Sequence, residues 1–404
     1  MSYNWDEVIE GEIAARHAEI ASLNRLIHSN PELAYEEHEA HDAFVSVLQS
    51  LGFEVTPHAY GLDTAFSAEV GSGGRLVIFN AEYDALPGIG HACGHNLIAS
   101  SSFASFLGVA AALKASNLPG RVRLLGTPAE EGGGGKLKLI SAGAYNAAAA
   151  SLMVHPGPGH KLPPTIHGVA LVRMLANVKM RIHFTGREAH AAIAPWDGIN
   201  ALDAVCLAYS AVSMLRQHIR PHERIHGIFG AAGDRPNVVP AACRADYYVR
   251  GATRAQALAL WARVRRCFEG AAVATGCEAR VEPLNSYADV RPSAALCRAY
   301  VAAMGEGTAY DEPADFLAGS TDMGDVCYEC PGFHGAFGID TREGEGNHTK
   351  GFAAAAGTEE SLRRAVECGR GMALVAWRVL TDDGFAEEVR NEWEEDMRLS
   401  REGF

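Results

Sequence analysis

Three apolar, β-branched runs, each ending in glycine, proline and potential metal ligands, constrain the fold of this chain more than any other feature. They are "RLVIFNAEYDALPG" (75–88), "RVRLLGTPAEEGGGG" (121–135) and "AAASLMVHPGPG" (148–159). Helical segments separate them, and strands that alternate with helices form a mostly parallel sheet with helices on its faces. Ligands of such sheets bind beyond the carboxyl ends of the strands, so the sequence predicts an α/β fold with one polar, ligand-binding edge.

The middle of the chain has a different order of elements. Strands are expected at 178–186, in "RIHGIFGAAG", "CRADYYVRGA" and "EARVEPLNSY", and helices at 198–219 and in "RAQALALWARVRRCFEGAAVATG". The order β-α-β-β-α-β is typical of a ferredoxin-like unit. We therefore predict a catalytic domain over residues 1–175 and 289–404, interrupted by an inserted α+β domain over residues 176–288.

Composition narrows the range of partners. The formal net charge is −14 and no block of Lys and Arg occurs, which argues against nucleic acids and anionic membranes and favours a small-molecule substrate. The N-terminus does not resemble a signal peptide and the nine cysteines are irregularly spaced, so we expect a cytoplasmic protein without a disulfide framework. The apolar segment 97–113 carries four serines and is shorter than the roughly 20 residues of a membrane span, which predicts a buried helix.

Two histidines and a cysteine follow the first run within five positions, as His91, Cys93 and His95 of "GIGHACGH". Histidines near a turn are often only polar surface residues that contact solvent. A thiolate and an imidazole separated by one residue, however, can reach one ion and are typical ligands of zinc-like metals. We favour the metal hypothesis for Cys93 and His95, and assign His91 to the turn or to the support of a ligand.

The other strand exits carry further candidates. Glu130 and Glu131 form either an acidic surface turn or a pair in which one carboxylate binds a metal and the other moves protons from a metal-activated water. Two interpretations of His155 remain: a hydrogen-bonded core residue or a metal ligand. The same two interpretations apply to His348 in "GNHTKGF".

Six motifs share the order and the approximate spacing of a known family: "EYDALPGIGHACGHN", "GTPAEEGGGGK", "MVHPGP", "GREAHAA", "NVVP" and "GNHTKGF". The chain thereby resembles the M20 metallopeptidase and amidohydrolase family, from "IHSNPELAYEE" (27–37) to the final helices. It is most similar to the branch of aminoacylases and aminobenzoyl-glutamate hydrolases, and within it to the peptidase M20 domain-containing protein 2 type. The resemblance implies a zinc-exopeptidase-like catalytic domain whose insert is a lid and a dimerisation surface.

The resemblance also implies a metal-dependent hydrolase that cleaves an amide or peptide bond of dipeptides or N-acyl amino acids. Two divalent cations, zinc or manganese with cobalt and nickel as further candidates, would be held by Cys93, His95, Glu131, His155 and His348. Glu130 would act as general base and then as general acid. In the insert, His190 would stabilise the oxyanion by reaching the site of the other subunit of a homodimer, and Asn237 would hold the substrate.

Some positions depart from the family or leave alternatives open. Asn80 and Glu82 stand where many relatives have arginine and aspartate, which points away from the plant auxin-conjugate hydrolases. Asp322 and Asp325 either face a cationic substrate side chain or belong to a surface turn. Two functions of other classes remain: a catalytically inactive metal- or ligand-binding protein on the same fold, and a redox enzyme with Cys93 as nucleophile.

Overall fold

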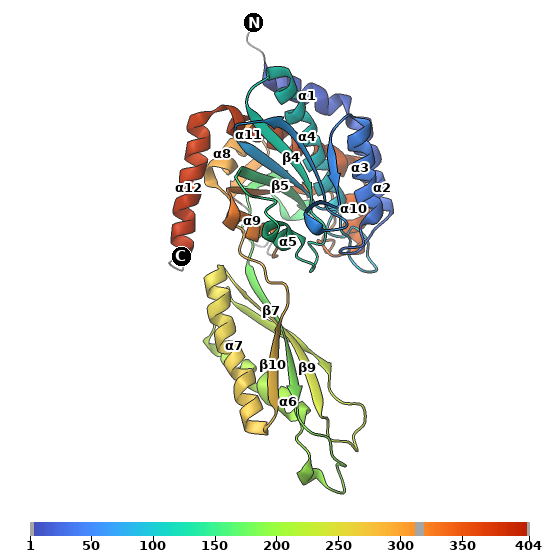
Figure 1. The fold of residues 1–404 in the computed structure, drawn as a ribbon, viewed down its shortest axis with the longest axis vertical. Coiled ribbons are helices and arrows are strands. Elements are labelled where there is room, and N and C mark those ends of the chain that lie inside the picture. Colours follow the sequence, from blue (N-terminus) through green and yellow to red (C-terminus); the bar gives the residue numbers. More distant parts are fainter. Residues whose placement is uncertain (1–3, 312–318, 402–404) are drawn as a thin grey trace. The chain divides into compact units, whose positions relative to one another are not determined.

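The computed structural model describes residues 4–311 and 319–401, which form two compact units (Figure 1). The first unit comprises Met1–Met174 and Val290–Arg398, and Leu175–Asp289 makes up most of the second. Each unit has a hydrophobic core of its own.

An eight-stranded mixed sheet forms the centre of the first unit. In spatial order its strands are β1 (Val55–Pro57), β2 (Phe66–Ser72), β4 (Gly120–Gly126), β3 (Leu76–Ala81), β5 (Ala148–Pro158), β12 (Gly332–Ile339), β6 (Gly168–Leu171) and β11 (Thr308–Asp311). β3 pairs in parallel with β4 and β5, and β5 pairs in parallel with β12. The three predicted strands are therefore β3, β4 and β5, and the predicted α/β fold is confirmed.

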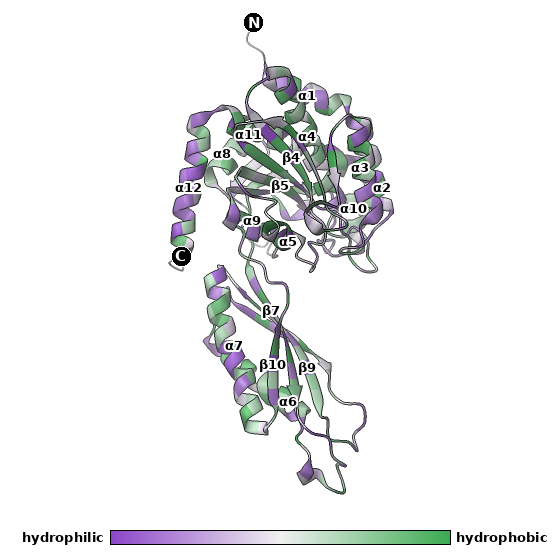
Figure 2. Cartoon of the chain, viewed as in Figure 1, coloured by the Kyte–Doolittle hydropathy of each residue, from purple (hydrophilic) through white to green (hydrophobic). Residues whose placement is uncertain are grey.

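Helices cover this sheet, and the last of them is strongly charged. The helices are α1 (Trp5–Ala15), α2 (His17–Ser29), α3 (His38–Ser50), α4 (His95–Ser116), α5 (Gly135–Ser141), α8 (Ala294–Met304), α9 (Met323–Glu329), α10 (Lys350–Ala356), α11 (Glu359–Thr381) and α12 (Asp383–Arg401), and two 3-10 turns are η1 (Ala59–Gly61) and η2 (Gly159–Lys161). α11 begins with a side-chain cap, where the Thr358 hydroxyl accepts a hydrogen bond from the Ser361 amide at 3.2 Å. Figure 2 shows that α12 is mostly hydrophilic.

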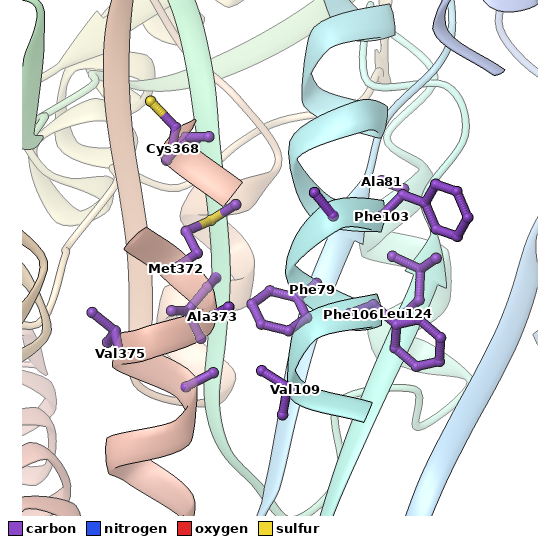
Figure 3. Packing of buried hydrophobic residues seen from close by; sticks show 14 of the residues in the cluster. Phe79, Ala81, Phe103, Phe106, Val109, Leu124, Cys368, Met372, Ala373 and Val375 are labelled. Atoms are coloured by element: carbon purple, nitrogen blue, oxygen red, sulfur yellow. The ribbon is translucent and has the colours of Figure 1, made fainter. Parts of the chain in front are cut away.

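α4 is the central helix of the core, and it packs against the sheet and against α11 (Figure 3). It is long and apolar enough to cross a membrane, but 94% of its most apolar window is buried inside the protein. The Ser105 hydroxyl contacts the carbonyl oxygens of Ser101 and Gly369, each at 2.8 Å. A Cβ on Gly369 would lie 2.6 Å from the Ser101 oxygen, so glycine is what lets α11 approach α4 this closely. The predicted buried helix is confirmed.

Side chains of β3 alternate between two cores. Val77 and Phe79 belong to the core around α4, whereas Ile78 packs with residues of α5 and α9 on the other face. Asn80 continues the Ile78 face, where its amide nitrogen donates to the Ser151 hydroxyl at 2.8 Å. Its oxygen accepts from the Tyr145 hydroxyl at 2.8 Å. Asn80, one of the departures from the family pattern, is thus a hydrogen-bonded core residue.

The glycine-rich stretch at 331–352 contains a central strand that the sequence does not predict. β12 is buried along its whole length between β5 and β6. A Cβ on Gly332 would lie 2.4 Å from the Cys327 sulfur, and a Cβ on Gly338 would lie 2.9 Å from the Gly159 Cα. Here glycine reflects close packing against α9 and η2 rather than a loop.

The second unit contains the elements β-α-β-β-α-β in the predicted order. They are β7 (Ala176–Thr185), α6 (Ala201–Leu215), β8 (Arg224–Ala231), β9 (Ala242–Gly251), α7 (Arg254–Thr275) and β10 (Glu278–Pro283), with 3-10 turns η3 (Pro195–Asp197) and η4 (Arg216–His218). The strands form an antiparallel sheet in the spatial order β10-β7-β9-β8. β8 is an edge strand, and it presents Ile228, which is 65% exposed, and Phe229 to its surroundings.

Candidate functional site

Six side chains with metal-ligand chemistry meet beyond the carboxyl ends of β3, β4 and β5. We call them the edge cluster: Cys93, His95, Glu130, Glu131, His155 and His348. Their ligand atoms form three groups of three, each within 4.8 Å of one another, and every two groups share one residue. The structure therefore brings Glu130 and the five predicted metal ligands together in one place.

Asp84 orients the imidazole of His95, the first residue of α4. Asp84 Oδ1 accepts from His95 Nδ1 at 2.9 Å, and Asp84 Oδ2 accepts from the Glu131 amide at 2.9 Å. Burial by itself would lower the pKa of His95, but the Asp84 carboxylate raises that pKa well above its usual value. His95 Nε2 is buried and has no hydrogen-bond partner in the described part of the chain. An orphaned buried nitrogen, on a ring held by a carboxylate, fits a metal ligand.

His155 and Cys93 face each other across the cluster, with 3.5 Å between Nε2 and Sγ. His155 Nδ1 lies 2.8 Å from the Pro156 carbonyl, to which it donates, so Nε2 carries the lone pair. Burial lowers the pKa of His155 to about 4 and raises the pKa of the Cys93 thiol. The neutral imidazole is the ligand form of histidine. The raised thiol pKa is the opposite of what a redox nucleophile needs, whereas coordination to a cation would remove the thiol proton.

Glu130 and Glu131 are neighbours in sequence with opposite electrostatics. Burial raises the pKa of Glu130 well above its usual value, and the carboxylates of Glu82, Glu131 and Asp322 raise it further. Burial also opposes ionisation of Glu131, but His348 Nε2, 3.2 Å from Glu131 Oε1, holds the Glu131 pKa below its usual value. Two carboxyl groups whose pKa values are pushed apart are typical of an ionised ligand beside a proton-transfer group.

The donor set of the edge cluster fits a divalent transition metal. One thiol, three imidazoles and two carboxylates converge, and thiolate with imidazole favours zinc-type cations. A backbone hydrogen bond fixes His348 next to Cys93: the His348 amide donates to the Ala92 carbonyl at 2.8 Å.

A buried ion triad, which the sequence does not predict, lies beside the edge cluster. Lys136 Nζ contacts Glu82 Oε1 and lies 2.7 Å from Asp322 Oδ1, and the Lys136 amide donates to Asp322 Oδ2 at 2.9 Å. All three side chains are fully buried, and Glu82 Oε2 lies 3.6 Å from His95 Nε2. The surface-turn interpretation of Asp322 is therefore wrong, and its carboxylate already has a cationic partner within the chain. Asp325 is buried as well.

Two further histidines are buried near the edge cluster but do not join it. The ring of His91 stacks on His28 at a centroid distance of 6.2 Å, and burial lowers the His91 pKa to about 3. His334, on β12, has its ring centroid 5.9 Å from that of His155, and burial lowers its pKa to about 3. His91 thus packs against α2, and its predicted role in the turn or in the support of a ligand stays a prediction. The sequence shows His334 in the glycine-rich stretch 331–352 but not its burial beside His155, because β12 was not recognised as a strand.

His190 and Asn237 lie side by side in the second unit. His190 forms a bridge with Val238, and the Ala191 amide donates to the Asn237 carbonyl at 3.0 Å. His190 Nδ1 lies 3.2 Å from the amides of both Ala192 and Ile193 and accepts from them, so in the neutral ring Nε2 carries the hydrogen. The exposed His190 ring therefore presents a donor to its surroundings.

Comparison with known proteins gives a consistent result. Residues 78–373 match the model of peptidase family M20/M25/M40. The chain is 38% identical to the Xaa-Arg dipeptidase of Mus musculus over 93% of this chain and 88% of that protein, and 35% identical to the Homo sapiens protein of the same name over 95% and 90%. It is 33% identical to one of the p-aminobenzoyl-glutamate hydrolase proteins of Escherichia coli over 67% and 58%.

Solved structures share the fold. A dinuclear metal binding peptidase from the M20 family of Bacillus subtilis superposes with a TM-score of 0.67 at 24% identity, covering 91% of this chain and 99% of that one. An aminobenzoyl-glutamate utilization protein from Klebsiella pneumoniae superposes with a TM-score of 0.71 at 19% identity, covering 93% and 99%. The resemblance stated from six motifs is confirmed, and with it the prediction of a metallo-hydrolase: the chain belongs to peptidase family M20/M25/M40.

Proposed function

We propose that this M20 hydrolase cleaves the amide bond of dipeptides, with two divalent cations held by the edge cluster. The observation that carries the proposal is the convergence of six ligand-type side chains from segments far apart in sequence at one sheet edge. The dinuclear peptidase that shares this fold supports the number of cations. Zinc and manganese are the first candidates, because the set mixes a thiol with imidazoles and carboxylates.

Within this proposal each side chain has a distinct task. Cys93 belongs to the two ligand groups that do not contain Glu130, and it would hold the cations together with the other members of those groups. His95 and His155 would complete one set, and Glu131 and His348 the other. Asp84 would fix both the His95 ring and the Glu131 backbone, so it supports one ligand from each set.

Glu130 would be the proton-transfer group. When bound, a pair of divalent cations lowers the pKa of water and polarises the scissile carbonyl. The Glu130 carboxylate would accept the proton of the attacking water and return it to the leaving amine. Its burial and its raised pKa support this role, because a carboxyl group with a raised pKa holds a proton more readily than an ordinary carboxylate and can pass it on.

The names of the relatives favour a basic C-terminal residue in the substrate. Two relatives that cover more than nine tenths of this chain are named Xaa-Arg dipeptidase. Asp322 is unsuited to recognise such a residue because Lys136 occupies its carboxylate. We therefore expect recognition of the guanidinium by groups other than Asp322.

Removal of metal should abolish hydrolysis of Xaa-Arg dipeptides reversibly. We expect chelation to lower kcat/KM by more than about 100-fold, and zinc or manganese to restore it, because the edge cluster has no other source of a nucleophile at neutral pH. The measurement is a panel of Xaa-Arg, Xaa-Glu and N-acetyl substrates, with metal content determined on the same samples. Full activity in metal-free protein would refute the mechanism, and preference for the N-acetyl substrates would refute the dipeptide assignment.

We also propose a homodimer formed through the second unit, in which His190 donates to the oxyanion at the partner's site and Asn237 binds substrate. The edge strand β8, with exposed Ile228 and Phe229, supports a surface that pairs with a copy of itself. The Nε2 hydrogen of His190 supports the donor role. The lid function of this unit, the cytoplasmic location and the lack of nucleic-acid or membrane partners stay predictions.

Mixing two inactive variants should restore activity if His190 acts in the partner's site. Glu130→Gln and His190→Ala are each expected to be nearly inactive. In a hybrid dimer, the His190→Ala subunit keeps Glu130 and receives His190 from the other subunit, which regenerates one site. Random exchange should then return about a quarter of wild-type activity. Mass spectrometry would show whether hybrid dimers have formed. If they have formed and the mixture is still as inactive as its components, His190 acts at the site of its own subunit.

A further inference from the structure

One N-terminal segment, residues 32–37, holds the turn that carries Glu130. Glu37 is fully buried, and its Oε1 accepts from the Ala129 amide at 2.8 Å. On the other side of the turn, the Tyr35 hydroxyl donates to the Gly133 carbonyl at 2.7 Å. The two hydrogen bonds enclose Glu130 and Glu131 between them, although about 95 residues separate the partners in sequence.

The turn needs this support because its backbone is strained. Ala129 has φ +61°, a left-handed conformation that non-glycine residues rarely adopt and that costs about 1–2 kcal/mol. Gly132 (φ +96°) and Gly134 (φ +68°) follow. Without Glu37 the buried Ala129 amide would lose its acceptor, and a left-handed residue without a hydrogen bond has little reason to keep that conformation.

Residue 35 of this segment also packs closely against Gly133. A Cβ on Gly133 would lie 2.5 Å from the Ala129 Cβ and 2.9 Å from Tyr35 Cε2. The Tyr35 ring therefore closes over this part of the turn, and only glycine fits beneath it.

The segment itself is anchored and can act as a rigid support. The Glu32 carboxylate accepts from the amides of Glu39 and Ala40 at 2.9 and 3.0 Å, at the start of α3. The Glu32 carbonyl accepts from the Ala85 amide at 2.7 Å, directly after Asp84. The same six residues thus contact the exits of both β3 and β4.

We propose that Glu37 and Tyr35 are positioning residues for Glu130: they hold the 128–133 turn in the one backbone conformation that aims the Glu130 carboxylate at the substrate. The proposal rests on the proton-transfer role proposed above for Glu130. Neither residue belongs to the edge cluster, so the turn is the route by which they act on catalysis.

The test compares variants of Glu37 that keep or lose the acceptor. Burial and the Asp84 carboxylate raise the pKa of Glu37 to about 7, so the uncharged amide of Glu37→Gln is a close mimic. We expect Glu37→Gln to keep kcat within about 3-fold, and Glu37→Leu to lower kcat by about 30-fold or more with KM and metal content unchanged, since small misplacements of a catalytic group can cost about 100-fold. Tyr35→Phe should lower kcat by about 5-fold. Thr64→Val is the matched control, because it removes the 2.8 Å bond to Glu37 Oε2 but leaves the bond to Ala129.

A double-mutant cycle shows whether the effect passes through Glu130. In a Glu130→Gln background, Glu37→Leu and Tyr35→Phe should cause no further loss of residual kcat. A full multiplicative loss there, wild-type kcat in Glu37→Leu, or equal damage by Glu37→Gln and Glu37→Leu would each overturn the proposal. If Glu37→Leu does not fold, Tyr35→Phe in both backgrounds decides. Full activity of Glu130→Gln alone would instead overturn the proton-transfer role, so the two failures are distinguishable.

Discussion

Glu130→Gln should lower kcat by about 100- to 10,000-fold, the range in which positioned general acid–base groups contribute. Glutamine has nearly the same volume and keeps an oxygen, so the buried pocket at this position is preserved. It cannot take a proton from water or return one to the leaving amine. KM and metal content should stay near their wild-type values, because the five other side chains of the edge cluster are the proposed ligands. Steady-state kinetics on an Xaa-Arg dipeptide, together with metal analysis, measures this outcome.

The neighbouring variant Glu131→Gln is the control for this prediction. Glu131 has the lowered pKa of an ionised ligand and contacts His348 at 3.2 Å. Its replacement should lower metal content together with activity, and added metal should restore part of the activity. If Glu130→Gln lost metal and Glu131→Gln kept it, the two roles would have to be exchanged.

Lys136→Met should lower the free energy of unfolding by about 3–5 kcal/mol, the cost of leaving buried charges without their partner. Glu82 and Asp322 are both fully buried and both contact the Lys136 ammonium. Methionine fills the space of the lysine stem but supplies no charge. The measurement is urea unfolding followed by circular dichroism. Wild type and variant are both metal-free, so that metal binding does not mask the difference in stability.

Two further variants make this prediction specific to the charges. Lys138→Met, on the same helix but exposed, should change stability by less than about 1 kcal/mol. Adding Glu82→Gln and Asp322→Asn to Lys136→Met removes the unpaired charges and should recover more than half of the lost stability. A loss below about 1 kcal/mol in Lys136→Met would mean that the triad contributes nothing net to folding.

Glu37 and Lys136 mark the limit of what local sequence patterns reveal. Each is a charged residue in an ordinary local context, Glu37 in the acidic stretch "YEEHE" near the N-terminus and Lys136 after a run of glycines. Their importance comes from burial beside partners that lie about 50 to 190 residues away. A pattern that extends over a few neighbouring residues contains no signal of such distances.

The surface-turn interpretation of Asp322 failed for the same reason. Its surroundings, "GSTDMGDV", have the composition of a turn. In the structure Asp322 precedes α9, and its carboxylate binds both the ammonium and the amide of Lys136. A carboxylate is buried in this way only when a cation reaches it, and that cation comes from α5.

The sequence by itself determined the α/β class, three strands of the central sheet, the order of elements in the second unit and the candidates of the edge cluster. These follow from the period of apolar residues and from the rule that strand exits of parallel sheets share one edge. Only the tertiary structure decided that β12 is a central strand, that Lys136 neutralises Glu82 and Asp322, and that Glu37 supports the Ala129 turn. Those features depend on desolvation and on hydrogen bonds between distant segments, which exist only once the chain has closed around them.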